Sequence, residues 1–297
     1  MTEPLRTAIV GCGAIAHWHL DANDRAGAPL KITAAVDPVA GNAQQVATRT
    51  GLHVLLEKPL APTLDACDRI LAAARTAGTV FMVAENAQYW PEVLTVRALL
   101  HEGAIGEVVT ARAATFFPAL ADFYGGDRPW RFDQAAAGGG VVIDTGSHWL
   151  RPLRMWLGEV DEVVAALGRP DPRMEGESLC RALLRFASGT IASFDAMLTT
   201  GGISPQPLFT VTGTTGELTV EGSGWVKLWH GTDWKGKKVG ERGGYLRSYE
   251  AELSDFASAV LHRTEPAASA AYAVGELRLA LAMYRSATSG RWEKVWT

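Results

Sequence analysis

The chain has 297 residues, of which 47% are hydrophobic and 20% are charged, and its formal net charge is −4. A chain of this length can bury enough apolar surface for two domains, and its negative charge argues against a nucleic-acid partner that depends on bulk positive charge. No apolar run approaches the length of a membrane span, and the N-terminus shows no secretory signal, so we expect no membrane partner.

The first predicted strand, residues 6–10, is followed at once by the letters GCGAIA and then by a helical stretch. This order matches the dinucleotide-binding fingerprint, G-x-G-x-x-A, in the strand–turn–helix context that it requires. Gly11 permits a tight turn, Gly13 lets the backbone approach a pyrophosphate, and Ala16 lets the helix pack closely on the strand. The free N–H groups at the start of the helix would bind the phosphates. The cofactor-binding candidates in this segment are Gly11, Gly13, Ala14 and Ile15.

A second predicted strand carries the letters LKITAAVDP, which contain Asp37. Asp37 follows Ala16 by 21 residues, where an acidic side chain in this kind of fold binds the ribose hydroxyls. A carboxylate at this position would also repel the 2′-phosphate of NADP. The sequence therefore predicts NAD as the cofactor and disfavours NADP.

The segment after Asp37 predicts more alternating helices and strands. Residues 40–50 read as a helix that ends at Gly51, and Val54–Leu56 form the continuous apolar run of a strand buried on both faces. Thr63 is placed to cap a further helix, and the letters TVFMVAEN predict another buried strand that ends at Asn86.

Four motifs, GCGAIA, AVDP, EKPLAPT and AENAQYWP, occur in this order along the chain. Together they resemble the glucose–fructose oxidoreductase / inositol dehydrogenase / MocA (Gfo/Idh/MocA) family. In that family the lysine of the EKP segment lies beside the nicotinamide and the substrate hydroxyl, and this role falls here on Lys58. The resemblance also implies that Glu57 and Asn86 border the cofactor.

The chain changes character after a predicted helix at residues 91–100. Residues 108–230 contain alternating or apolar runs typical of strands, with hairpin turns at Ser188-Gly189 and Thr215-Gly216. Two amphipathic stretches, residues 248–264 and 270–290, predict helices that cover the resulting sheet.

These patterns predict an α/β plus α+β protein with two domains. Residues 1–87 would form a shortened dinucleotide-binding domain with a Rossmann-type parallel sheet. Residues 88–297 would form a substrate-binding domain whose large, mostly antiparallel sheet is covered by helices on one face. The uncovered face predicts a homo-oligomer, as in relatives of this family.

The segment that begins at Gly138-Gly139-Gly140 supplies the catalytic candidates of the second domain. Asp144 and His148 are four residues apart, so they would share one face of a helix. A histidine, with an unperturbed pKa of about 6.5, can accept a proton near neutrality, and a carboxylate one turn away can orient its imidazole. The segment resembles the family's G-G-G-x-x-x-D-x-G-x-H pattern, whose aspartate and histidine belong to the catalytic site. Trp130 and Arg131 either line a sugar site or pack on the rim of the sheet.

The resemblance implies oxidation of a sugar or an inositol-like polyol at a secondary hydroxyl. His148 would take the hydroxyl proton with the help of Asp144, while Lys58 would hydrogen-bond the same oxygen and the hydride would pass to NAD. Because Lys58 and His148 belong to different predicted domains, we expect the site in the interdomain cleft. The catalytic candidates are Lys58, Asp144 and His148.

Other potential ligand residues predict no further site. No group of His, Asp or Glu has a convincing metal-ligand spacing, so we predict no metal. Cys12, Cys67 and Cys180 are far apart and odd in number, which predicts reduced thiols in a cytoplasmic protein. His17 and His19, just after the glycine turn, read as packing residues.

The sequence departs from the family pattern after the ribose-binding acid. The family has two further strand–helix units there and a T-P-x-x-x-H loop, whereas residues 38–56 hold one helix and one strand. Gly51 matches both the glycine that ends the family's second helix and the glycine that begins its EKP strand, so an internal segment looks removed. We expect the strand at Val54–Leu56 to take the vacant place beside residues 6–10, a shift of about one strand spacing, roughly 4.8 Å.

These residues are compatible with three functions. The first is an NAD-dependent sugar or polyol dehydrogenase with a shortened cofactor domain. The second is a non-catalytic ligand-binding or regulatory relative, impaired by the deleted strands. The third is an NAD-dependent glycosidase that recycles its cofactor, which would use the same residues as the first.

Overall fold

The computed structural model describes residues 5–10, 14–26, 30–36, 53–117, 130–199, 202–222, 224–239 and 244–297. Its contacts divide the chain into a first unit, residues 1–90 and 243–274, and a second unit, residues 91–242 and 275–297. The predicted boundary after residue 87 placed residues 243–274 in the second domain, whereas their contacts lie in the first unit.

The first unit contains two strand–helix–strand pieces, both with parallel strands. One piece consists of β1 (Leu5–Val10), α1 (Ala14–Ala26) and β2 (Leu30–Val36). The other consists of β3 (Val54–Glu57), α3 (Leu64–Ala77) and β4 (Phe81–Ala84). Thr63 caps α3 as predicted, because its hydroxyl accepts the Ala66 N–H at 3.3 Å. The predicted helix at residues 40–50 lies outside the described residues.

In the described part of the chain, no ladder joins β3 to β1. The strands form separate two-stranded sheets, β1 with β2 and β3 with β4. The prediction that the Val54–Leu56 strand pairs beside β1 is therefore wrong for these residues. Apolar side-chain contacts, described next, join the described residues of the two pieces.

Helix α8 (Gly244–His262) supplies those contacts, together with the short helix η1 (Asn86–Tyr89) beside it. Leu246, Tyr249, Leu253 and Ala257 of α8 form one buried cluster with Ala22 and Leu30 of the first piece, and Leu55 of β3 packs against it. Phe256 of α8 also packs on Met82 of β4. We expected α8 to cover the antiparallel sheet. Its periodicity correctly predicts a buried face but does not specify the surface that the face covers.

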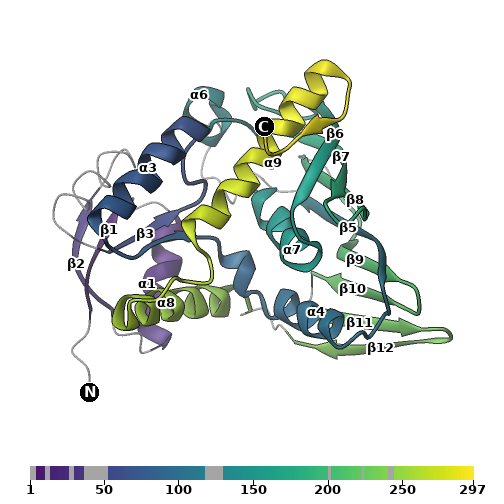
Figure 1. Cartoon of the computed structure of the whole chain (residues 1–297), viewed down its shortest axis with the longest axis horizontal. Coiled ribbons are helices and arrows are strands. Elements are labelled where there is room, and N and C mark those ends of the chain that lie inside the picture. The colour runs from purple at the N-terminus through teal and green to yellow at the C-terminus, as the bar shows by residue number, and fades with distance from the viewer. Residues whose placement is uncertain are drawn as a thin grey trace. The chain divides into compact units, whose positions relative to one another are not determined.

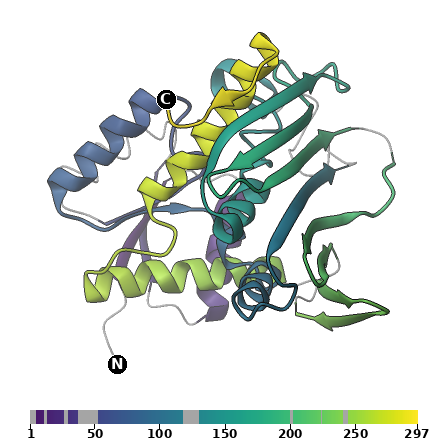
Figure 2. The ribbon, with the colours of Figure 1, turned by 45° about the vertical axis from the view of Figure 1, so that its right-hand side comes forward.

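The second unit is built on a nine-stranded sheet (Figures 1 and 2). Its strands, in chain order, are β5 (Val108–Phe117), β6 (Val160–Gly168), β7 (Leu179–Phe186), β8 (Ile191–Leu198), β9 (Pro207–Gly213), β10 (Glu217–Glu221), β11 (Trp225–His230), β12 (Asp233–Lys238) and β13 (Glu293–Lys294). Their order across the sheet is β12-β11-β10-β9-β5-β8-β7-β6-β13, and only β5 and β8 pair in parallel. The predicted, mostly antiparallel sheet is confirmed, as are its turns near Gly189 and Gly216.

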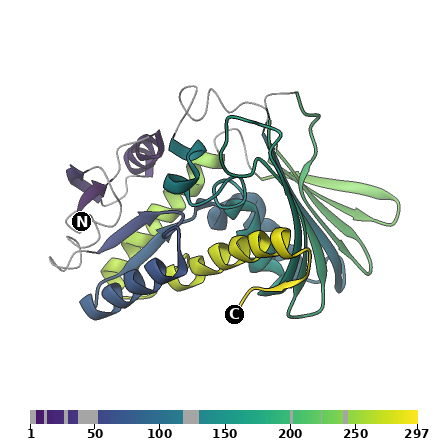
Figure 3. The same ribbon diagram turned by 90° about the horizontal axis from the view of Figure 1, so that it is seen from above.

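Helices lie on one face of this sheet (Figure 3). They are α4 (Pro91–His101), α7 (Ser147–Leu157) and the second part of α9 (Ala270–Ser289), with the short helices η2 (Trp130–Phe132) and α6 (Gln134–Ala137) between α4 and α7 in the chain. Trp149 of α7 stacks on Phe209 of β9, with 6.4 Å between ring centroids. Alternate residues of β7 and β8, such as Leu184 and Phe194, are fully buried under these helices.

The opposite face, here called the open face, carries the alternate side chains of the same strands. Asp195 of β8 forms ion pairs with Arg112 of β5 at 3.0 Å and with Arg181 of β7 at 2.7 Å. Leu183 of β7 and Ile191 of β8 are 44% and 42% exposed. The open face therefore combines paired charges with exposed aliphatic side chains.

Candidate functional site

The glycine turn that predicts cofactor binding falls largely outside the described residues. Gly11, Gly13 and Asp37 are not described, whereas Ala14 and Ile15 form the start of α1. The strand predicted before the turn and the helix predicted after it are both present, because β1 ends at Val10 and α1 begins at Ala14. The N–H groups at the start of α1 are the part of the predicted phosphate site that the structure contains.

The turn that carries Lys58 lies directly after β3 and is linked to α1. The His19 Nε2–H of α1 donates to the Glu57 Oε1 of β3 at 2.8 Å, and Glu57 Oε2 accepts the Lys58 backbone N–H at 3.2 Å. The Lys58–Pro59 peptide bond is cis. His19 was predicted to be a packing residue, but its contact with Glu57 fixes the helix that follows the glycine turn to the EKP turn.

Aromatic and acidic side chains of α8 surround His19. The Tyr249 ring meets the imidazole edge-on at 5.0 Å between centroids, and Glu252 Oε2 lies 3.9 Å from His19 Nδ1. Trp18 stacks on Tyr249 at 6.4 Å. Burial raises the pKa of the Tyr249 hydroxyl, which keeps this group neutral. The His19 side of the linkage between α1 and the EKP turn is therefore packed on α8, whereas 41% of the Glu57 side chain is exposed.

Asn86, a predicted cofactor-binding residue, is 2% exposed. Its side-chain Nδ2 donates to the Ser248 hydroxyl of α8 at 3.1 Å. The structure thus gives Asn86 a role in attaching the end of β4 to α8. Its predicted role toward the cofactor stays a prediction.

The four-residue spacing predicts that Asp144 and His148 lie on one helix, but the structure does not place them on one helix. Helix α7 begins at Ser147, and Asp144 lies in the helical turns that precede it, where its N–H bonds to the Gly140 carbonyl at 3.1 Å. Glycine is required at position 146, because a Cβ there would lie 2.5 Å from the Val142 carbonyl oxygen. This tight turn lets the chain pass from the Asp144 segment directly into the first turn of α7.

Arg131 lies beside both Asp144 and Trp130. Its Nε is 3.4 Å from Asp144 Oδ2, and its guanidinium carbon is 4.5 Å from the centroid of the Trp130 ring. Trp130 is 57% exposed. The Trp130 ring is consequently open to a ligand, while Arg131 places a positive charge next to the predicted catalytic carboxylate.

Glu177 anchors the glycine segment, a role that the sequence analysis missed. Its carboxylate accepts the Gly140 N–H at 3.0 Å, the Val142 N–H at 2.9 Å and the Tyr284 hydroxyl at 3.0 Å. A Cβ at Gly140 would overlap the Glu177 carbonyl, so only glycine allows this approach. Burial raises the pKa of the Glu177 carboxyl, whereas the two N–H groups and the Tyr284 hydroxyl lower it. Glu177 thereby holds the chain that leads to Asp144.

Helix α7, which carries His148, is fixed to α9 by buried charges. Arg151 is fully buried, and its Nε lies 2.9 Å from Glu276 Oε1 of α9. Arg154 pairs with the same carboxylate. A buried ion pair of this kind costs about 3–5 kcal/mol when one partner is removed, so it fixes the helix strongly in one position.

The predicted catalytic residues therefore lie in two preorganised segments, one in each unit. Lys58 follows β3 in the first unit, and Asp144 and His148 flank the start of α7 in the second. The described residues contain no cluster of His, Cys, Asp and Glu that could hold a metal ion. No described helix has the length and apolar character needed to cross a membrane.

Two family models match the chain. One, described as the GFO/IDH/MocA C-terminal domain, matches residues 93–219. The other, described as an oxidoreductase family with an NAD-binding Rossmann fold, matches residues 47–85. The second match begins just before Gly51, so it includes the EKP turn and leaves out the glycine turn.

Named relatives of the chain include sugar reductases and dehydrogenases. A 1,5-anhydro-D-fructose reductase of Ensifer adhaerens is 31% identical over 258 residues, which cover 84% of this chain and 75% of that protein. A D-apiose dehydrogenase of Paraburkholderia graminis is 30% identical over 59% of this chain and 46% of its own length. Thus the chain spans three quarters of the first relative and about half of the second.

Solved structures share the fold at lower sequence identity. A levoglucosan dehydrogenase in complex with NADH and L-sorbose has a TM-score of 0.87 at 19% identity, with 99% of each chain covered. An oxidoreductase from Agrobacterium radiobacter in complex with NAD⁺, L-tartaric acid and magnesium has a TM-score of 0.84 at 20% identity, with 98% of each chain covered. The Rossmann-like sheet followed by a large antiparallel sheet is thus a known fold.

Replacement of Glu177 by Ala should destabilise the second unit. The change leaves the N–H groups of Gly140 and Val142 buried without their acceptor, and each such group costs about 1–3 kcal/mol. We expect the free energy of unfolding to fall by at least about 2 kcal/mol, measured by urea denaturation.

Glu175→Ala is the matched control, because Glu175 is an exposed carboxylate two residues away that accepts the exposed N–H of Gln134. It should change the free energy of unfolding by less than about 0.5 kcal/mol. Equal effects of the two substitutions would show that Glu177 does not anchor the glycine segment.

Proposed function

Because the chain belongs to the Gfo/Idh/MocA family of oxidoreductases, we propose that it transfers a hydride between a secondary hydroxyl of a sugar or polyol and NAD. The observation that carries this proposal is the bond between His19 and Glu57. It fixes the helix after the glycine turn to the turn that carries Lys58, although the chain between them is short. The proposed activity needs both segments, one for the cofactor phosphates and one for the reacting oxygen.

In the proposed reaction the protein positions the substrate and moves one proton. His148 accepts the proton of the substrate hydroxyl, and Asp144 stabilises the imidazolium that forms. Lys58 donates a hydrogen bond to the same oxygen. NAD supplies the hydride acceptor when it is bound. Arg131, next to Asp144, orients this carboxylate and offers a further donor to a sugar hydroxyl or ring oxygen.

The cofactor specificity rests on the sequence. Asp37 favours NAD, and the family model that matches residues 47–85 is described as NAD-binding. We propose a cytoplasmic protein, on the pattern of its three cysteines, of which Cys67 and Cys180 are buried free thiols. Trp130, exposed beside Arg131, is the proposed aromatic surface for the sugar.

Two alternatives use the same residues. A glycosidase that recycles its cofactor would cleave a glycoside with no net NADH, while a non-catalytic relative would bind a ligand without turnover. The His19–Glu57 link supports the dehydrogenase, because it fixes the EKP turn to the helix that would bind the cofactor phosphates. Net NADH production from a free sugar or polyol separates the dehydrogenase from the glycosidase.

Lys58→Ala and His148→Ala should each lower kcat by about 10²–10⁴-fold, because each removes a group that contacts the reacting oxygen or its proton. The assay follows NADH formation by the intact chain with NAD and a panel of aldoses, inositols and anhydrosugars. His101→Ala, at the end of α4, is the control and should keep wild-type kcat.

Wild-type turnover that survives both substitutions would contradict the assigned roles. Glycoside cleavage without NADH release would replace the proposed function by the glycosidase. Ligand binding with no turnover of any compound would support the non-catalytic relative.

The open face is the proposed surface for self-association. Leu183 and Ile191 are exposed there next to Asp195, which forms ion pairs with Arg112 and Arg181 of the same chain. A second copy could cover these aliphatic side chains without burying an unpaired charge.

Leu183→Glu should therefore convert an oligomer into monomers, because it would bury a charge between two copies. Sedimentation velocity measures the outcome. Leu94→Glu is the control, since Leu94 of α4 is equally exposed at 44% but does not lie on the sheet. A monomeric wild-type chain, or an oligomer unaffected by Leu183→Glu, would rule out this surface.

A further inference from the structure

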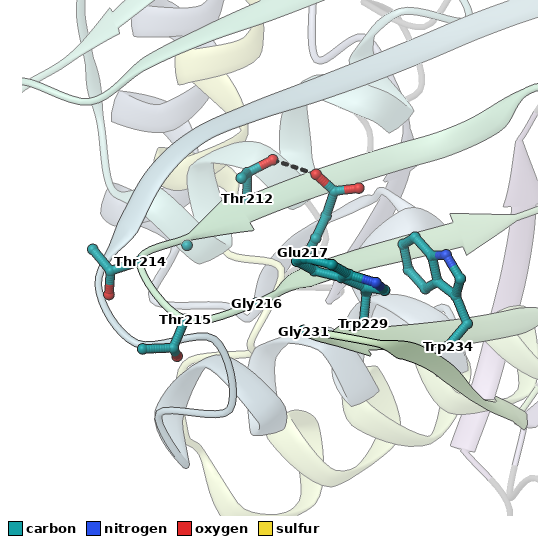
Figure 4. Close-up of a pocket in the computed structure, with 9 residues that line it drawn as sticks. Thr212, Thr214, Thr215, Gly216, Glu217, Trp229, Gly231 and Trp234 are labelled. Atoms are coloured by element: carbon teal, nitrogen blue, oxygen red, sulfur yellow. Dashed lines mark hydrogen bonds between the residues drawn. The ribbon is translucent and has the colours of Figure 1, made fainter.

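A pocket at one end of the open face, where the β9–β10 turn meets the β11–β12 turn, belongs to the surface proposed for self-association (Figure 4). Its exposed rings, Trp229 and Trp234, are opposite each other on that face. Its hydroxyls already have partners, because Thr212 Oγ1 donates to Glu217 Oε2 at 2.7 Å and Thr214 Oγ1 accepts a backbone N–H at 3.1 Å. The further inference concerns a histidine of the first unit.

His53, directly before β3, accepts a hydrogen bond from the neighbouring strand. The Val80 N–H donates to His53 Nδ1 at 2.9 Å, and the Val80 carbonyl accepts the Val54 N–H at 2.9 Å. The β3–β4 ladder begins one residue later, with Val54 opposite Phe81, and contains four residue pairs. The imidazole therefore adds one hydrogen bond at the start of a short ladder.

This hydrogen bond exists only while the His53 imidazole is neutral. A backbone N–H is always a donor, so Nδ1 must offer its lone pair and the ring proton must be on Nε2. Protonation of Nδ1 turns the acceptor into a second donor that faces the Val80 N–H. Since His53 is exposed, protons from the solvent reach it directly. Acid therefore converts an attractive contact at the start of β3 into a repulsive one.

The groups around His53 favour the neutral ring. Partial burial, and then the positive charge of Arg263 just after α8, lower the pKa of the imidazole. Residues 76–84, which include β4, carry no charged side chain, and Arg75 before them is a cation as well. Among the described residues, no carboxylate offsets the effect of Arg263 on the His53 pKa.

Three more titratable groups belong to the same elements or to the chain next to them. Glu57 lies at the far end of β3, where it is bonded to α1. At the end of α8, His262 Nδ1 donates to the Ser258 carbonyl at 2.9 Å, and Glu265 nearby is exposed. None of the three contributes to the lowered pKa of His53.

We propose that His53 is a pH-sensitive switch at the start of the strand that leads to the EKP turn. As a neutral imidazole it joins the start of β3 to β4, and as an imidazolium it releases the Val80 N–H and is repelled by Arg263. The strand that it fixes ends at Glu57, directly before Lys58. The switch concerns the ladder alone, so it goes beyond the proposed function and holds whether or not the chain transfers a hydride.

The direction of the pH effect follows from the two states of the ladder. When the start of β3 is detached, the pKa of His53 has its ordinary value of about 6.5. When it is attached, the pKa is lower, so the attached state binds fewer protons between the two values. The hydrogen bond is therefore fully present above about pH 6.5 and is lost as the pH falls through the lower pKa of the attached state.

Amide hydrogen exchange at Val80 in the intact chain, corrected for the intrinsic exchange rate, tests the switch. In wild type the protection of this amide should fall about fivefold from pH 7.5 to pH 5.0, the factor expected for one net hydrogen bond. His53→Asn places a neutral carbonyl oxygen at the position of Nδ1, so protection should be high at both pH values. His53→Ala has no acceptor, so protection should be low at both.

His262→Asn is the matched control, because the bond from His262 Nδ1 to the Ser258 carbonyl is one that protonation preserves. It should leave the pH dependence at Val80 as in wild type. Arg263→Gln removes the nearby positive charge, so it should move the midpoint of the acid transition upward, toward pH 6.5.

Three results would overturn the proposal. Equal protection of the Val80 amide at both pH values in wild type would show that the imidazole does not control the bond. A loss of protection in acid that persists in His53→Asn would assign the acid effect to another group. An imidazole of His53 that titrates at or above about pH 6.5, followed by NMR through its C2–H resonance, would show that the folded chain does not favour the neutral ring.

Discussion

The packing of α8 on both strand–helix–strand pieces is the interaction on which the first unit depends. In the described residues the β1–β2 and β3–β4 ladders share no backbone hydrogen bond, so side chains must hold the pieces together. Tyr249 and Leu253 cover Ala22 and Leu30 of one piece, and Leu55 of the other packs against the same cluster. A buried apolar side chain contributes about 1.5–3 kcal/mol, so a cluster of this size can substitute for a short ladder. The His19–Glu57 bond adds a fixed distance between α1 and the EKP turn.

Local sequence patterns predicted most elements but not their partners. Val54–Leu56 forms a strand as its apolar run indicated, and Thr63 caps its helix. The pairing of that strand was wrong, because an apolar run identifies burial and does not identify a neighbour. The same limit explains α8, whose periodicity specified an apolar face while contacts with α1, distant in the chain, decided its place.

In the candidate site, too, local motifs identify residues but not their partners far along the chain. Motifs identified Lys58, Asp144 and His148. They did not show that His19 fixes the EKP turn or that Glu177 fixes the glycine segment. His19 lies 38 residues from Glu57, and Glu177 lies 37 residues from Gly140, so no local spacing connects them. Asp144 and His148 were misplaced on one helix because the Gly146 N–H bonds to the Val141 carbonyl, five residues back, so the regular hydrogen bonds of α7 begin only after Asp144. A motif search omits such partners because they lie far along the chain from the segments that they fix.

The central claim is that the shortened first unit still holds the glycine-turn helix and the EKP turn in a geometry that binds the cofactor. Titration of the intact chain with NADH, followed by the change in NADH fluorescence, tests it most directly when wild type and His19→Ala are compared. The account predicts saturable binding by wild type and a Kd about tenfold higher for His19→Ala, as expected for loss of one hydrogen bond to a charged group that orders the site. No binding by wild type at millimolar NADH, or equal Kd values for both proteins, would contradict it.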